Sequence, residues 1–317
     1  MKNYTRLTQE ERWHIAVHHS NGKSIGCISR LLNRHHATIS RELQRNRTAQ
    51  GYKAEQAHTI ATNRHCYRNQ QRRKIKGNVF SLIVEKIQQY WSPKQTSGWL
   101  RETHGFYISH ETIYQRIWRD KRSGGKLYRY LRHGGRKYQK RGQQKYAGRG
   151  YIPGRIDIEH RPEIVAKKSR IGDWELDTIV GANHQGYLVS MVERVSKYTK
   201  LLLVPDCKAD TVKTALLQTL SCFKNKVLTL TADNGKEFSL HQEVAAALKA
   251  SFFFAKPYHS WERGLNEHTN GLVRQFLPKG TNFLTISHEK VQWIENLLNN
   301  RPREVLNFKT PQQVFMP

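Results

Sequence analysis

Three acidic residues in apolar surroundings could act together on a phosphodiester. Asp177 and Asp233 lie in short, strand-like apolar runs, and Glu267 lies in a segment with a helical pattern. Carboxylate oxygens are hard ligands of the kind that Mg²⁺ prefers. Two such ions about 3.5–4 Å apart can clamp the attacking and leaving oxygens of a phosphodiester. If the three segments converge, the sequence predicts a two-metal site that cuts or joins a nucleic acid.

The strand around Asp177 offers more than one candidate. Side chains alternate along a strand, so Asp173, Glu175 and Asp177 share one face. Spacing alone does not decide which of them binds metal, and all three could be edge or surface charges.

Asp233 stands at a more informative place. It ends the apolar run 228–233 and is followed by Asn234-Gly235, a turn signal. Ligand sites of open α/β sheets gather at the ends of strands. We therefore expect Asp233 at a strand end in the site.

The segment around Glu267 reads as a helix that begins at Ser260. Glu262 falls in its first turn, where a carboxylate interacts favourably with the helix dipole. Glu267 falls on a polar stripe with other groups suited to phosphate or to orienting a carboxylate, namely Arg263, Asn270 and Arg274. We interpret this stripe as a DNA-facing wall; an ion pair between Arg263 and Glu267 is the alternative.

Charge is distributed unevenly along the 317 residues. Residues 1–150 hold 32 basic and 8 acidic residues, whereas residues 151–317 hold 22 and 17. Such an excess attracts a polyanion and releases its counterions. No apolar run approaches the roughly 20 residues needed to span a bilayer. We therefore expect double-stranded DNA as the partner, no membrane, and a cytoplasmic, nucleoid-associated protein.

The four cysteines are far apart and form no CxxC pair. This spacing indicates neither a disulfide framework nor a structural zinc site.

Two segments read as helix-turn-helix modules. Residues 8–45 form three short helices, and the third exposes polar groups that could reach bases or phosphates. The pattern recurs at 77–119, with a final helix from His110. The DNA-contacting side chains that we predict in the two modules are Thr38, Ser40, Arg41, Gln44, His110, Gln115 and Arg116.

Residues 121–149 have a different composition. They hold eleven basic residues, six glycines and no acidic residue. Such a stretch cannot bury a core. We predict a linker that binds the phosphate backbone and adds little sequence information, through Arg136, Lys137, Lys140 and Arg141.

From about residue 171 the pattern changes to α/β. Three strand-like runs with short connections are followed by alternating helices and strands, the element order of a ribonuclease H-like fold. We predict a multidomain chain of all-α modules followed by this core. The expected parts are a helix-turn-helix domain at 1–50, a basic connector at 51–76, a second such domain at 77–120, a Gly-rich linker at 121–160 and the catalytic core at 161–317.

Three motifs together resemble a known family. Gly172-Asp-Trp-Glu-Leu-Asp-Thr178, Thr231-Ala-Asp-Asn-Gly-Lys-Glu-Phe238 and Trp261-Glu-Arg-Gly-Leu-Asn-Glu267 look like the Asp-Asp-Glu transposases of the insertion-sequence-thirty family, as do Asn270-Gly-Leu272 and Pro278-Lys-Gly-Thr281. The 33 residues between Asp233 and Glu267 agree with that family. Leu176 and His268 depart from its common glycine and asparagine, and neither belongs to the triad.

The resemblance implies a function. Asp177, Asp233 and Glu267 would be the metal-binding triad, with two Mg²⁺ ions per site and Mn²⁺ as a substitute. The protein would bind terminal inverted repeats, cut DNA and transfer a strand to target DNA, acting as a dimer or larger assembly. Two alternatives remain open: a catalytically silent, transposase-derived transcriptional regulator, and a ribonuclease H-like nuclease without strand transfer.

Overall fold

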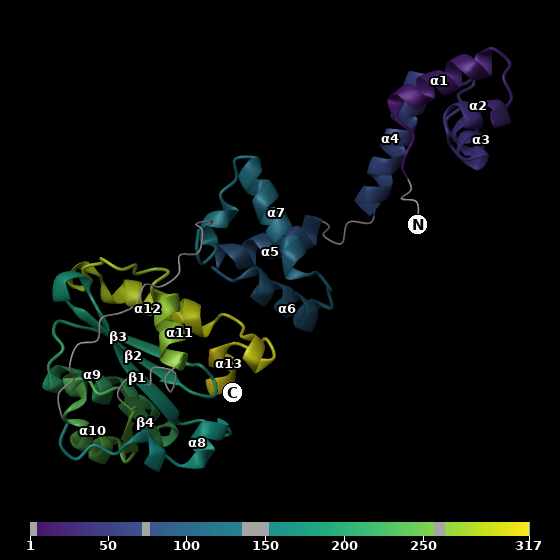
Figure 1. The fold of residues 1–317 in the computed structure, drawn as a ribbon. Helices are drawn as coiled ribbons and strands as arrows, with labels where there is room; N and C mark the ends of the chain where they lie inside the picture. The colour runs from purple at the N-terminus through teal and green to yellow at the C-terminus, as the bar shows by residue number, and fades with distance from the viewer. Residues whose placement is uncertain (1–4, 72–76, 135–151, 257–263, 317) are drawn as a thin grey trace. The chain divides into compact units, whose positions relative to one another are not determined.

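The computed structural model describes residues 5–71, 77–134, 152–256 and 264–316. Its chain divides into two compact units, residues 1–76 and 77–317, and each is described by itself (Figure 1). Our predictions for Ser260, Glu262, Arg263 and the four basic residues Arg136, Lys137, Lys140 and Arg141 lie outside the described residues.

The first unit is a helical bundle around a small apolar core. Thr8 caps the first helix in a reciprocal capping box with Glu11, and Ser24 caps the second. Ile15, Ile28 and Ile39, one from each of the first three helices, are fully buried together. The helices are α1 (Gln9–Ser20), α2 (Ile25–Leu31), α3 (His36–Arg45) and α4 (Ala54–Gln71).

Helix α4 occupies most of the range that we predicted as a basic connector. We expected a basic connector at 51–76, but α4 fills most of that range and packs on α1 through the buried Ala54 and Ala57. Most of its other residues are polar and show no apolar periodicity, so the local sequence pattern does not predict a helix there. The first unit therefore extends beyond residue 50.

The second unit begins with another three-helix module. Ser92 caps its middle helix in a capping box with Gln95, and Gly105 ends that helix with φ 65°, a left-handed conformation that suits glycine. The elements are α5 (Gly77–Gln88), α6 (Pro93–His104), α7 (His110–Arg122) and the short helix η1 (Leu127–Tyr130). The range 121–134, predicted as linker, thus holds the end of α7 and η1.

The core of the second unit is a five-stranded mixed sheet in the order β3-β2-β1-β4-β5. The three strand-like runs with short connections form an antiparallel meander, and β4 and β5 add in parallel on the other side of β1. The strands are β1 (Asp173–Val180), β2 (Tyr187–Glu193), β3 (Thr199–Val204), β4 (Thr229–Ala232) and β5 (Ser251–Phe254).

Helices cover both faces of this sheet (Figure 1). One face, which includes Trp174 and Leu176, packs on α9 (Ala209–Leu220) and α10 (His241–Leu248). The other face, which includes Ile179, packs on α11 (Gly264–Val273) and α12 (His288–Asn299). The sequence did not predict two short helices, α8 (Glu163–Lys167) and α13 (Pro311–Phe315).

Helix α13 ties the end of the chain to the core. Phe315 is fully buried and stacks on Tyr198, with ring centroids 4.4 Å apart. None of the helices in the described ranges is both long and apolar enough to cross a membrane.

Candidate active site

The three carboxylates on one face of β1 have different environments. Asp173 is 0% exposed, accepts a 2.8 Å hydrogen bond from Oγ1 of Thr229 and pairs with Arg170. Glu175 is 2% exposed and pairs with the guanidinium of Arg194. Both charges are neutralised by buried or half-buried arginines, so both carboxylates have a structural explanation.

Asp177 is half-buried and has a different kind of partner. Its Oδ2 accepts a 2.6 Å hydrogen bond from Nδ2 of Asn270 on α11. Ser190, opposite Asp177 on β2, donates a 3.1 Å hydrogen bond from Oγ to Oδ1 of Asn270. Both polar atoms of the Asn270 amide are thus hydrogen-bonded. The amide donates to Asp177 without neutralising the charge of the carboxylate.

Asp233 directly follows β4, the strand that pairs in parallel with β1. In the parallel pairing of β1 with β4, Asp173 faces Thr229 and Glu175 faces Thr231. Asp233 comes directly after the last residue of β4, and the same register continued by two residues aligns it with Asp177. Asp233 therefore stands at the carboxyl end of β4, and Asp177 lies two residues beyond the last residue of β1 that pairs with β4.

The turn after β4 is held by side chains. Oδ1 of Asp233 accepts a 3.0 Å hydrogen bond from the backbone N–H of Gly235, an Asx turn. The buried Asn234 donates to the carbonyl of Ala255 at 2.6 Å and accepts from Nη1 of Arg155 at 2.6 Å. The Asn-Gly pair is therefore a fixed support for Asp233.

Glu267 lies in the first turn of α11 and is exposed. Asn270 follows three residues later, and residues three apart lie on the same side of a helix. The contact of Asn270 with Asp177 shows that this side of α11 faces β1 at that position. In the described ranges, no group of three or more His, Cys, Asp or Glu side chains is arranged to hold a metal ion.

The donor chemistry nevertheless fits a hard divalent cation. Asp177 on β1 and Asp233 directly after β4 carry carboxylate oxygens, and such oxygens are the ligands that Mg²⁺ prefers. Like-charged carboxylates repel one another when no cation lies between them. The ligand roles of Asp177, Asp233 and Glu267 all remain predictions.

Arg274 has a structural environment that the sequence did not reveal. Its Nη2 donates a 2.8 Å hydrogen bond to the carbonyl of Val180, and its guanidinium lies 5.5 Å from the ring centroid of Phe283. Burial lowers the pKa of Arg274. These contacts favour support of the end of β1, and a DNA contact by Arg274 remains a prediction.

The predicted DNA-contacting residues of the modules differ in exposure. On α3, Arg41 and Gln44 are exposed and Thr38 and Ser40 are half-buried, opposite the buried Ile39. Their side of α3 is therefore available to a partner.

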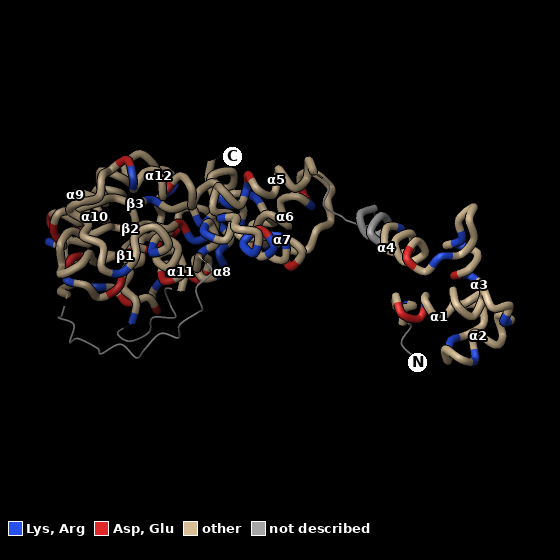
Figure 2. Tube along the Cα trace, turned by 90° about the horizontal axis from the view of Figure 1, so that it is seen from above, with Lys and Arg blue, Asp and Glu red and all other residues tan. Residues whose placement is uncertain are grey.

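On α7, His110 and Gln115 are exposed, whereas the guanidinium of Arg116 lies 5.2 Å from the ring centroid of Phe80. Figure 2 shows Lys and Arg positions along α7 and near α11.

Comparison with known proteins agrees with this architecture. The helix-turn-helix domain family matches residues 3–46, and the integrase core domain family matches residues 168–260. The catalytic core domain of BIV integrase aligns with 46% of this chain and 95% of its own, at 20% identity and a TM-score of 0.38. The two matched domain families define a DNA-binding polynucleotidyl transferase with an integrase core.

Full-length relatives identify the family. The transposase for insertion sequence element IS4351 of Bacteroides fragilis is 43% identical over 98% of this chain and 95% of the relative. Transposase InsI for insertion sequence element IS30C of Escherichia coli K12 is 33% identical over 98% of this chain and 83% of the relative. The chain belongs to the IS30 family of insertion-sequence transposases.

Proposed function

We propose that the chain binds the terminal inverted repeats of a bacterial insertion sequence, cuts a phosphodiester at the element's end, and joins the resulting 3′-hydroxyl to target DNA. Family membership and the helix-turn-helix module support DNA recognition. The exposed polar side of α3, with Arg41 and Gln44, supports direct contact with the DNA. Because two DNA ends have to be joined, the protein would act as a dimer or larger assembly.

One observation carries the chemical part of the proposal. Continued by two residues, the register of β1 and β4 would align Asp177 with Asp233, and Asn270 of α11 is bonded to Asp177. Asp177, Asp233 and Glu267 would hold Mg²⁺, with Mn²⁺ as a substitute. Bound there, the metal would stabilise charge on the attacking and leaving oxygens of the phosphodiester.

The chain's own residues would orient this site. Asn270 holds one oxygen of Asp177, and Ser190 fixes the amide of Asn270. Asn234 supports the turn that carries Asp233. Partners of this kind commonly change activity by about 10–100-fold when removed.

The linker would add affinity without sequence preference. Its basic residues suit the phosphate backbone, which carries no direct sequence information. Neutralising Arg136, Lys137, Lys140 and Arg141 together should weaken binding to end DNA and to random duplex by similar factors.

The test compares two glutamates of identical charge. Glu267→Gln should abolish Mg²⁺-dependent cleavage and strand transfer while leaving binding to the element's ends intact. Asp177→Asn and Asp233→Asn should have the same effect. Glu262→Gln is the matched control, because on a continuous helix five residues turn by roughly 500°, about 140° away from Glu267. A dead Glu262→Gln variant beside an active Glu267→Gln variant would refute the triad. Specific binding by a wild-type chain that never cuts would instead identify a regulator.

A further inference from the structure

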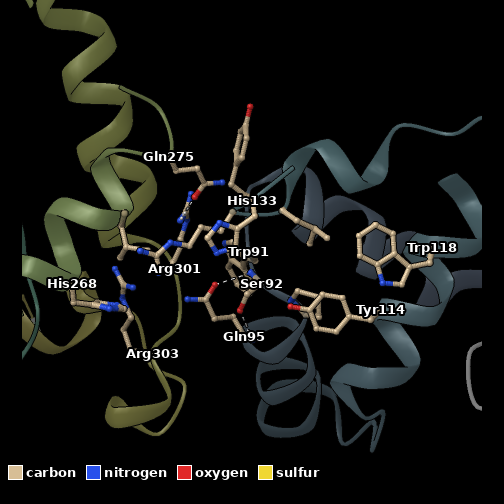
Figure 3. Close-up of a pocket in the computed structure, with 15 residues that line it drawn as sticks. Trp91, Ser92, Gln95, Tyr114, Trp118, His133, His268, Gln275, Arg301 and Arg303 are labelled. Atoms are coloured by element: carbon tan, nitrogen blue, oxygen red, sulfur yellow. Dashed lines mark hydrogen bonds between the residues drawn. The ribbon is translucent and has the colours of Figure 1, made fainter. Parts of the chain in front are cut away.

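The second unit contains a cavity of about 430 Å³ that has no role in the proposed triad (Figure 3). Helices α6 and α7 form one wall of the cavity. Helix α11 and the segment after α12 form the opposite wall. Ligand pockets for small organic groups typically have volumes of roughly 300–1,000 Å³. The cavity is therefore large enough for one nucleotide-sized group.

Two arginines on the second wall carry N–H groups that the described residues leave without acceptors. Arg301 is 3% exposed, and its Nε and Nη2 have no hydrogen-bond partner there. Its Nη1 reaches Oε1 of Gln275 at 3.4 Å. Arg303 donates from Nη2 to the carbonyl of Leu298 at 3.1 Å, while its Nε has no such partner. Buried charges without partners are costly, so these groups favour an anionic ligand.

Other cations surround the same place. Nη2 of Arg132 lies 2.7 Å from where a Cβ would stand on Gly271, so the absence of a side chain there lets the guanidinium approach α11. Burial, with Arg303 next, lowers the pKa of Arg301 to about 9, and the same two causes, burial first, lower the pKa of His268. The positive charge around this cavity therefore exceeds the negative charge that the protein places beside it.

A second cavity of about 460 Å³ shares His268 and Arg303 with the first. Its wall includes Lys168, Lys197 and Arg194. Glu175 is the acidic residue among the described lining residues of the two cavities, and it pairs with Arg194. The cationic surface therefore continues from the first cavity into the second.

The first wall is aromatic. Tyr114 and Trp118 are one turn apart on α7, so they share a side of the helix. Figure 3 shows them across the cavity from Arg301 and Arg303, with Trp91 between the two groups. A base stacks on such rings without sequence preference, whereas guanidinium groups bind phosphate.

Helix α11 joins this cavity to the carboxylate site. His268, Leu272 and Gln275 line the cavity, while Asn270 contacts Asp177. Helix α11, which carries Glu267, therefore lies between the cavity and the carboxylate site. A DNA strand could occupy both at neighbouring positions.

We propose that this cavity holds one unpaired nucleotide of the DNA strand, with its phosphate on Arg301 and Arg303 and its base against Tyr114 and Trp118. The proposal rests on the proposed function, because it assumes that DNA is the substrate. It adds that the protein takes one nucleotide out of the duplex beside the active site. Extruding a base costs a few kcal/mol in a paired duplex and least where the base is already unpaired.

The experiment measures binding of the full chain to two random-sequence duplexes that differ by a single unpaired thymidine. We expect the wild type to bind the duplex with the unpaired base on the order of tenfold more tightly, the size of one base–aromatic stack. Tyr114→Leu and Trp118→Leu should remove most of that preference and leave binding to the paired duplex unchanged. Tyr107→Leu, which removes an exposed ring outside the cavity, is the control and should keep the preference.

The cations are tested in the same way. Arg301→Gln and Arg303→Gln should lose the preference, whereas Lys224→Gln, an exposed cation outside both cavities, should retain it. Because Arg301 is buried, thermal melting of each variant identifies those that fail to fold, and the two aromatic variants test the site independently.

The outcomes separate this proposal from the proposed function. Equal wild-type affinity for both duplexes, or equal loss in Tyr107→Leu, would overturn the nucleotide site while leaving DNA binding established. A wild type that binds neither duplex would contradict the proposed function itself. Displacement by thymidine monophosphate without any preference for the unpaired base would also overturn the proposal and indicate a free-nucleotide site.

Discussion

Asn270 donates a 2.6 Å hydrogen bond from Nδ2 to Oδ2 of Asp177 and thereby links α11 to β1. The contact joins residues 93 positions apart. The hydrogen bond also determines which side of α11 faces β1. The orientation of Asp177 therefore depends on a neutral amide that Ser190 fixes in turn.

Replacing Asn270 with alanine should lower cleavage without abolishing it. Asp177 would keep its charge and lose its orientation, so we expect a decrease of about 10–100-fold. The Mg²⁺ concentration required for half-maximal cleavage should rise, which a purely structural defect would not cause. Asn296→Ala, on the exposed side of α12, is the control. An unchanged Mg²⁺ requirement in Asn270→Ala would show that the amide does not position the ligand.

Glu175→Gln should damage stability, in contrast to Asp177→Asn. Glu175 pairs with the buried Arg194, and removal of one partner from a buried ion pair costs about 3–5 kcal/mol because the other charge is left uncompensated. Asp177→Asn removes a half-buried charge and should cost much less. Urea unfolding measures the two free energies, and cleavage is compared at matched folded concentration. Equal stability of the two variants would contradict the structural role of Glu175.

Runs of β-forming residues predicted the strands of the core, and alternation along β1 placed Asp173, Glu175 and Asp177 on one face. The same alternation could not separate Asp173, Glu175 and Asp177. Arg170, which pairs with Asp173, is only three residues away. The partners of the other two are Arg194, 19 residues after Glu175, and Asn270, 93 residues after Asp177, so only the folded chain shows them.

Other features had no local signal. Helix α4 buries small residues such as Ala54 and Ala57 against α1, so no strong apolar stripe marks it. Arg274 fits a polar stripe in sequence, yet its hydrogen bond goes to Val180 on a strand 94 residues earlier. The cavity beside α11 is formed by α6, α7 and the segment after α12, and no short motif spans these elements.

Glu42→Gln should destabilise the first unit. Glu42 accepts a 2.7 Å hydrogen bond from Nε of the buried Arg12 and another from the Tyr52 hydroxyl at 3.2 Å. We expect a loss of about 3–5 kcal/mol, as for other broken buried pairs. A fragment of residues 1–76 should melt at lower temperature and lose DNA binding, since α3 carries Glu42. Glu55→Gln, exposed on α4, should leave both unchanged; an equal loss in both variants would contradict this assignment.

Binding of an unpaired nucleotide should weaken as the pH rises above about 8. Burial, followed by the charge of Lys168, lowers the pKa of Lys197 to about 8. The charge of Arg194 also lowers this pKa, whereas the charges of Glu193 and Glu175 raise it. In the free protein, charging Lys197 opposes folding below that pH, and the cost disappears as the pH rises toward 10.5.

A phosphate in the adjoining cavity favours the charged lysine and so raises its pKa. The preference for the duplex with one unpaired thymidine should therefore be full below pH 8 and decline above it, with proton uptake on binding in between. Lys197→Asn should flatten this profile, because asparagine tolerates the left-handed backbone there, φ 62°, and carries no charge. Lys249→Asn, at φ 51° on the surface of the core, is the matched control. A profile that declines equally in both variants would place the titrating group elsewhere.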